Sequence, residues 1–218
     1  HQLDAVRKLT AHAREHGPGQ NYLVQHSAGS GKSNSIAWLA HHLQSLHDEN
    51  DKPVFDTVIV LTDRRNLDSQ LSADVDAVGT VQGVVRRIEE KDHSSGLRDA
   101  INEGAQIITS TIQKFPYICK ETKAQGKNFA VIIDEAHSSQ TGRAHAKMKY
   151  ALADYTVADP EDPTAEDEIV KEMRSQGTLP NLSIFAFTAT PKAATLEVFG
   201  TKDEEGNPAP FHLYSMKQ

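Results

Sequence analysis

The residues best suited to chemistry form one short run near the start of the chain, HSAGSGKS at positions 26–33. An apolar stretch precedes the run and a helical pattern follows it, which is the setting of a phosphate-binding loop. The two glycines would let the backbone turn so that its N–H groups point at phosphates, and the helix N-terminus would add the positive end of its dipole. The predicted nucleotide-binding residues are Ser27, Ala28, Gly29, Ser30, Gly31, Lys32 and Ser33.

Two side chains of this run have distinct predicted roles. Lys32 would reach the β- and γ-phosphates of ATP, and the Ser33 hydroxyl would ligate Mg²⁺. His26 stands where the loop pattern asks for glycine. The alternative interpretation is a loop rich in glycine and serine with an exposed lysine.

A pair of acidic residues follows a second apolar run. Asp134 and Glu135 come directly after FAVII at 129–133. A carboxylate at the end of a buried strand is costly unless a cation meets it. We predict that Asp134 holds the Mg²⁺ shell and that Glu135 orients and deprotonates the water that attacks the γ-phosphate. The alternative is a helix N-terminus at which two acids complement the dipole.

The elements that must position these residues alternate along the chain. Strands are expected at 21–25, 55–61, 105–109, 129–133 and 183–187, and helices over the first residues, at about 32–46 and at about 64–78. Most of these strands are rich in β-branched or aromatic residues, as buried central strands are. The predicted fold is α/β, with a mostly parallel sheet, helices on both faces and the nucleotide at the carboxyl ends of the strands.

Composition narrows the class of protein. The 218 residues suit one α/β domain, and no run approaches the roughly 18 apolar residues of a membrane helix, so no membrane partner is expected. A single cysteine, Cys119, excludes an internal disulfide and fits a reducing cytoplasm. The net charge is −7, but six of the acidic residues lie at 158–168, so the rest is nearly balanced. Charge therefore neither supports nor excludes contact with DNA.

The order of the two motifs, with Thr188-Ala189-Thr190 after the last expected strand, resembles the ATP-binding lobe of superfamily 2 helicases. That lobe is a RecA-like P-loop NTPase domain. The resemblance implies ATP and Mg²⁺ as cofactors. It also implies that His137, Thr188 and Thr190 couple the nucleotide site to the nucleic-acid site.

Longer blocks resemble the motor part of the R subunits of type I restriction enzymes. They are LVQHSAGSGKSNSIAWLA (23–40), VIVLTDRRNLDSQL (58–71), STIQKF (110–115), DEAHSSQTGR (134–143) and FAFTATPK (185–192). R subunits are similar in carrying a residue other than glycine at the place of His26. The resemblance implies a first motor lobe over 1–200 and a connector over 201–218 toward a second lobe.

The same resemblance implies ATP-driven movement of double-stranded DNA in a complex with modification and specificity subunits. Cleavage would belong to a nuclease domain elsewhere in a longer polypeptide, and no cleavage is expected from this segment. Two alternatives stay open. One is another superfamily 2 motor, such as a type III restriction subunit or a repair helicase. The other is a nucleotide-responsive DNA-binding module that does not hydrolyse ATP.

Further contacts follow from the resemblance alone. Gln2 matches the glutamine that reads adenine in many of these proteins, and its amide can both donate and accept. The competing interpretation is an exposed glutamine near the start of the chain. The implied DNA-contacting residues are Thr62, Arg64, Arg65, Gln70, Thr109 and Thr111. For these residues the competing interpretations are surface ion pairs of the arginines and helix capping by the threonine hydroxyls.

Three other regions have structural expectations only. Trp38 is expected in the core, because it lies within the helix after the phosphate loop. The acidic, proline-containing stretch at 158–168 is expected to be an exposed loop. The residues after Gly200 have turn chemistry and are expected to be mostly disordered or loosely docked.

Overall fold

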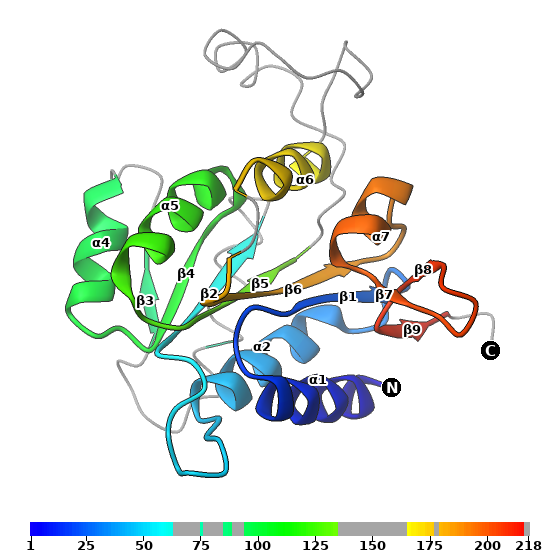
Figure 1. The fold of residues 1–218 in the computed structure, drawn as a ribbon, viewed down its shortest axis with the longest axis horizontal. Helices are drawn as coiled ribbons and strands as arrows, with labels where there is room; N and C mark the ends of the chain where they lie inside the picture. The colour runs from blue at the N-terminus through cyan, green and yellow to red at the C-terminus, as the bar shows by residue number, and fades with distance from the viewer. Residues whose placement is uncertain (63–74, 76–84, 89–93, 135–164, 177–178, 216–218) are drawn as a thin grey trace, which may run out of the picture.

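The computed structural model describes residues 1–62, 75, 85–88, 94–134, 165–176 and 179–215 (Figure 1). The described helices are α1 (Gln2–His16), α2 (Lys32–Gln44), α4 (Ser94–Asn102), α5 (Phe115–Gln125), α6 (Ala165–Gln176) and α7 (Ala193–Phe199), with a short 3-10 turn, η1 (Ile112–Lys114), before α5. The described strands are β1 (Asn21–His26), β2 (Thr57–Thr62), β3 (Val85–Arg87), β4 (Ile107–Thr111), β5 (Phe129–Ile133), β6 (Leu182–Thr188), β7 (Thr201–Lys202), β8 (Pro208–Ala209) and β9 (His212–Tyr214).

The main sheet has seven strands in the order β3-β4-β2-β5-β6-β1-β9, and each neighbouring pair is parallel. All its strands therefore end at one edge. At this edge β1 leads into the predicted phosphate-binding loop, β5 leads into Asp134, and β6 ends at Thr188. The prediction of an α/β fold with a mostly parallel sheet is confirmed. The five expected strands are β1, β2, β4, β5 and β6, with bounds that differ from the expectation by at most two residues.

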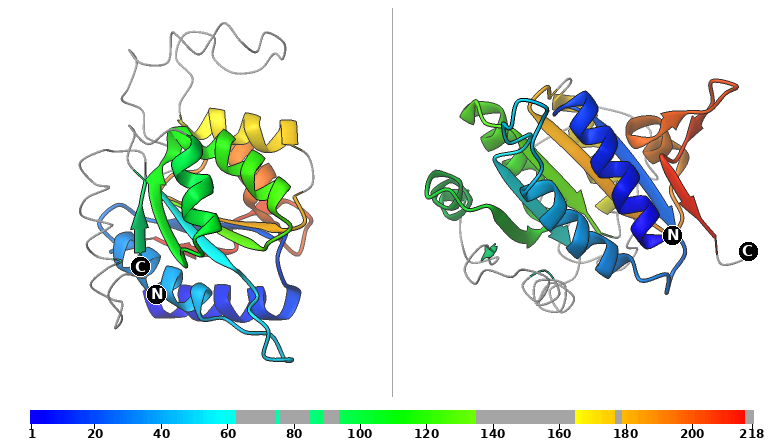
Figure 2. Two further views of the ribbon diagram at one scale, coloured as in Figure 1. Left: turned by 90° about the vertical axis from the view of Figure 1, so that its left-hand side faces the viewer. Right: turned by 90° about the horizontal axis from the view of Figure 1, so that it is seen from below.

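Helices cover both faces of the sheet, as predicted. Helices α1 and α2 lie side by side on one face, and α4, α5, α6 and α7 lie on the other (Figures 1 and 2). The sequence of β5 requires this arrangement, because its five residues are all buried. Phe129 and Ile133 pack in one core and Ala130 and Ile132 in the other, as expected when successive side chains point to opposite faces.

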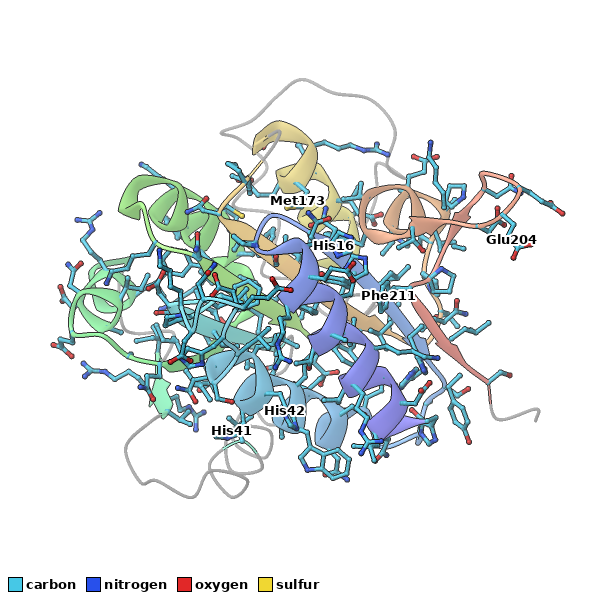
Figure 3. The ribbon with its side chains drawn as sticks, turned by 60° about the horizontal axis from the view of Figure 1, so that its bottom comes forward. His16, His41, His42, Met173, Glu204 and Phe211 are labelled. Carbon is cyan, nitrogen blue, oxygen red and sulfur yellow. The ribbon has the colours of Figure 1, made fainter. Side chains whose placement is uncertain are left out.

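The C-terminal residues depart from the expectation. Strand β9 lies at the edge of the main sheet, in parallel register with the last residues of β1. Before it, the Phe211 N–H donates to the carbonyl oxygen of Leu23 at 2.9 Å. The ring of Phe211 lies beside α1, with its centroid 5.3 Å from that of His12 (Figure 3). A disordered or loosely docked tail is therefore wrong for residues 201–215, because backbone pairing and ring packing hold β9 and the segment before it.

Two smaller expectations are also wrong. Trp38 is 37% exposed, because Ala37 and Leu39 beside it belong to the side of α2 that is turned to the core. The loop expected at 158–168 is wrong only for residues 165–168, which begin α6, because residues 158–164 lie outside the described residues. Asp167 suits the positive end of that helix, and its carboxylate lies 2.7 Å from the Lys192 ammonium. Within the described part of the chain, no helix has the length and apolar character needed to cross a membrane.

Candidate nucleotide site

Residues 26–33 form the turn between β1 and α2, at the edge where the parallel strands end (Figure 1). The φ angles of Gly29 and Gly31 are +76° and +78°, in the left-handed region that favours glycine. Gly31 is also the N-cap of α2, and a Cβ atom there would collide with the side-chain amide of Gln2. The backbone thus has the turn that the glycine spacing predicts, and it leads directly into a helix N-terminus.

Lys32 is the first residue of α2 and its side chain lies inside this turn. It is 7% exposed, and its Nζ donates to the carbonyl oxygens of His26 and Ser27, each at 3.4 Å. Ser33 follows it on the exposed side of the helix start, and Ala28 and Gly29 are exposed in the loop. The ammonium is therefore held among loop carbonyls, at the position from which a phosphate-binding lysine acts.

Ser30 gives an independent sign of a ligand. Its hydroxyl oxygen is buried and has no hydrogen-bond partner among the described residues. A buried hydroxyl without a partner costs free energy, roughly 1–3 kcal/mol, so native sites with such groups call for an explanation. A bound phosphate, which offers several acceptor oxygens, would supply that partner.

Asp134 comes at the end of β5, and its N–H donates to the carbonyl oxygen of Leu61 at 2.8 Å. The side chain is 8% exposed. In the sheet, only β6 separates β5 from β1, so Asp134 ends two strands away from the phosphate loop, about 10 Å at the usual strand spacing. The carboxylate is thus at the same edge as Lys32 and Ser33. Glu135, predicted to act as the base, lies outside the described residues.

Gln2 opens α1 and reaches back to the loop. Its amide Nε2 donates to the carbonyl oxygen of Ser30 at 2.7 Å and to that of Gly31 at 3.3 Å. The resemblance assigned Gln2 to adenine, and the structure places it against the phosphate loop itself. Adenine reading stays a prediction, and support of the loop by the side-chain amide is an additional role.

The residues predicted to contact DNA fall into two groups. Arg64, Arg65 and Gln70 lie outside the described residues. Thr62 ends β2, Thr111 ends β4 and Thr109 lies in the middle of β4, and they are 3%, 6% and 2% exposed. These three hydroxyls are therefore not on the surface here, and contact with DNA through them would need a rearrangement. Thr111 is the N-cap of η1 but makes no side-chain capping bond, so the capping interpretation gains no support at that residue.

The predicted coupling residues are only partly described. Thr188 is the last residue of β6 and is fully buried, while Thr190, two residues further, is exposed. Because Thr188 pairs with Gln25 in the sheet register, it ends beside the start of the phosphate loop. His137 lies outside the described residues. The position of Thr188 fits a role next to the nucleotide, and coupling stays a prediction.

Sequence reasoning missed a polar network behind the loop. The Nε2 atom of His26 lies 2.8 Å from Nδ1 of His212, and Nε2 of His212 lies 3.1 Å from a carboxylate oxygen of Asp4. His26 is completely buried. Burial, with the nearby His212 and Lys32 as smaller contributions, lowers the pKa of His26 to about 4. The one available signal was the histidine at a glycine position; nothing in the sequence linked it to residues 4 and 212.

The side chains at this edge fit ATP with Mg²⁺. The loop offers a helix N-terminus and a lysine for phosphates, and Ser33 and Asp134 offer the hydroxyl and carboxylate oxygens that Mg²⁺ prefers. The parallel sheet, the loop after β1 and the acidic residue after β5 together define a P-loop NTPase lobe of RecA-like fold.

The family follows from comparison with known sequences. The profile of the SWI2/SNF2 ATPase family matches residues 1–218. The chain belongs to that family, which confirms an ATPase of the helicase type. The type I restriction enzyme HindI endonuclease subunit of Haemophilus influenzae is 30% identical over 210 residues, covering 90% of this chain and 18% of that protein. The chain therefore spans less than a fifth of the length of this relative.

Solved structures agree on the fold. The UvsW helicase from bacteriophage T4 has a TM-score of 0.51 at 14% identity and covers 91% of this chain and 54% of that one. The Hef helicase domain of Pyrococcus furiosus has a TM-score of 0.53 at 16% identity and covers 89% of this chain and 34% of that one. The predicted resemblance to a superfamily 2 motor lobe of an R subunit is confirmed.

Proposed function

We propose that this chain is the first motor lobe of the R subunit of a type I restriction enzyme, and that it binds and hydrolyses ATP to move double-stranded DNA. The observation that carries the proposal is the phosphate loop: Lys32 lies inside a turn with two left-handed glycines, at the same sheet edge as Asp134. The similarity to the HindI endonuclease subunit, over 90% of this chain, supports the restriction-enzyme role.

The chain's own groups would share the work of ATP hydrolysis. The loop N–H groups and Lys32 would bind the β- and γ-phosphates, and Ser33 and Asp134 would hold Mg²⁺. When bound, Mg²⁺ would neutralise the charge that develops on the phosphate oxygens. Glu135 would orient the attacking water and accept its proton. Thr188 and Thr190, with His137, would pass the state of the nucleotide to the DNA-binding surface.

Further parts of the mechanism would lie outside this segment. The proposal places DNA cleavage in a nuclease domain, the second half of the ATP site in a second lobe, and recognition of a DNA sequence in the modification and specificity subunits. Residues 1–200 would form the lobe and residues 201–218 the connector. Strand β9 pairs with β1, so residues 212–214 of the connector would belong to the lobe's sheet.

The test uses the full-length protein assembled with its modification and specificity subunits. We expect ATP hydrolysis that is stimulated by double-stranded DNA containing the recognition site, and displacement of a triplex-forming strand placed at a distance from that site. A non-hydrolysable ATP analogue serves as the control and should give no displacement. ATP hydrolysis that single-stranded DNA stimulates and duplex DNA does not would contradict the proposal and favour a different helicase role.

A further inference from the structure

Strand β9 contacts the phosphate loop through both backbone and side chains. The Ser27 N–H donates to the carbonyl oxygen of Tyr214 at 3.1 Å, and the Ser27 hydroxyl donates to the same oxygen at 3.3 Å. Two residues earlier on β9, His212 contacts the ring of His26. The first two residues of the loop are therefore both held by β9. These are also the two residues whose carbonyl oxygens accept from Lys32.

The hydrogen-bond partners assign the protons on the two imidazoles. A carboxylate only accepts, so Nε2 of His212 carries the proton that it donates to Asp4. In a neutral His212, Nδ1 is then an acceptor, and Nε2 of His26 is the donor across the 2.8 Å contact. When both rings are neutral, the order of donation therefore runs from His26 to His212 to Asp4, and each ring has one tautomer.

The location of the pair makes it sensitive to loss of a partner. His26 is fully buried and His212 is 8% exposed, so water would not easily replace a missing hydrogen bond. The other ring nitrogen of His26, Nδ1, is already buried without a partner among the described residues. The contact with His212 is thus the one hydrogen bond of the His26 ring in the described structure, and it fixes the orientation of that ring.

We propose that His212 is a positioning residue for the nucleotide site: it accepts a hydrogen bond from His26 and thereby holds the carbonyl oxygens that place Lys32. This inference rests on the proposed ATPase function. Asp4 supports this role by fixing the tautomer of His212. Helix α1, which carries Asp4 and Gln2, and strand β9 therefore both act on the phosphate loop. The expected effect is on ATP binding, because the residue that His212 helps to place, Lys32, would bind the phosphates.

Substitutions of His212 separate this role from general packing. In the full-length protein, His212→Asn keeps an acceptor at the place of Nδ1, whereas His212→Gln keeps the reach to Asp4 but loses that acceptor. His212→Leu loses both. We expect His212→Leu and His212→Gln to raise the KM for ATP about tenfold with kcat changed less than twofold, because a buried donor is left without a partner. His212→Asn should stay within about threefold of the wild type.

The matched control is Leu213→Ala, on the same strand with a side chain that is 60% exposed, and it should leave the KM unchanged. Thermal unfolding reports whether each variant folds, and if His212→Leu does not, the contrast between Asn and Gln decides. Equal KM values for Asn and Gln, or a wild-type KM for all three, would overturn the positioning role. Binding of a fluorescent ATP analogue to the wild type separates the two proposals, since absence of binding there would overturn the proposed function as well.

Discussion

The ammonium of Lys32 lies 3.4 Å from the carbonyl oxygen of His26, the residue with which β1 ends. This lysine is thus held by the strand that leads into its own loop. A triphosphate would offer this ammonium oxygens of full negative charge in place of carbonyl oxygens, and charge-assisted hydrogen bonds are the stronger ones. The loop carbonyl oxygens therefore hold the lysine where it would meet a phosphate.

Replacement of Lys32 by alanine should remove nucleotide binding or turnover in the full-length protein. We expect at least a 100-fold loss of kcat/KM, because roughly 3 kcal/mol or more of charge stabilisation is lost when such a donor is removed. Steady-state ATP hydrolysis measures this. Lys120→Ala, on the exposed side of α5 across the sheet, is the matched control and should hydrolyse ATP normally. Normal hydrolysis by Lys32→Ala would remove the basis of the ATP assignment.

Replacement of Glu135 by glutamine should separate binding from hydrolysis. The amide still contacts water but cannot accept its proton, so we expect kcat to fall by roughly 10²–10⁴-fold. Binding of a fluorescent ATP analogue should stay close to that of the wild type. Glu103→Gln provides a matched control, because Glu103 lies on the surface and pairs with Arg86. If Glu135→Gln kept its turnover, another residue would have to be the base.

Gln2 permits a test of adenine reading against loop support. Its Nε2 atom donates to Ser30 and Gly31 in the loop, while its side-chain oxygen has no hydrogen bond among the described residues. That oxygen could accept from the amino group of adenine. We expect Gln2→Ala to raise the KM for ATP by roughly five- to tenfold.

The comparison of ATP with GTP distinguishes the two roles of Gln2. Adenine reading predicts that the preference for ATP over GTP falls in Gln2→Ala, because GTP lacks the amino group in question. Pure loop support predicts equal weakening for the two nucleotides. An unchanged KM for both would show that neither contact matters for binding.

The site was predictable to the extent that it depends on neighbours in sequence. An apolar run that ends in Asp134, and glycines spaced for a turn before Lys32, carry their chemistry locally. Strand β9 could not be predicted from the sequence, because a three-residue strand of sequence HLY has no periodic pattern and is fixed only by pairing with β1. The burial of Thr62 and Thr109 likewise comes from strands packed around them, which no local pattern records.

The buried His26 should make the free energy of unfolding depend on pH. Burial lowers the pKa of His26 to about 4, from 6.5 for the exposed group. Between these two values the unfolded chain binds a proton that the folded chain does not, so the free energy of unfolding rises with pH across this window. As pH falls from 6.5 to about 4, His26 should therefore destabilise the fold, by at most about 1.4 kcal/mol per pH unit.

Urea unfolding at a series of pH values measures this slope, and the difference between the wild type and His26→Gln isolates it. The variant keeps a side-chain amide near the place of Nε2 but has no group that titrates here. Asp4, whose pKa is lowered chiefly by its hydrogen bond to Lys8 and then by that to His212, loses its contribution below pH 4, outside the window. Burial lowers the pKa of His12 too, and this contribution is common to both proteins, so it cancels in the difference. Identical slopes for the wild type and His26→Gln would show that His26 is not held neutral in the fold.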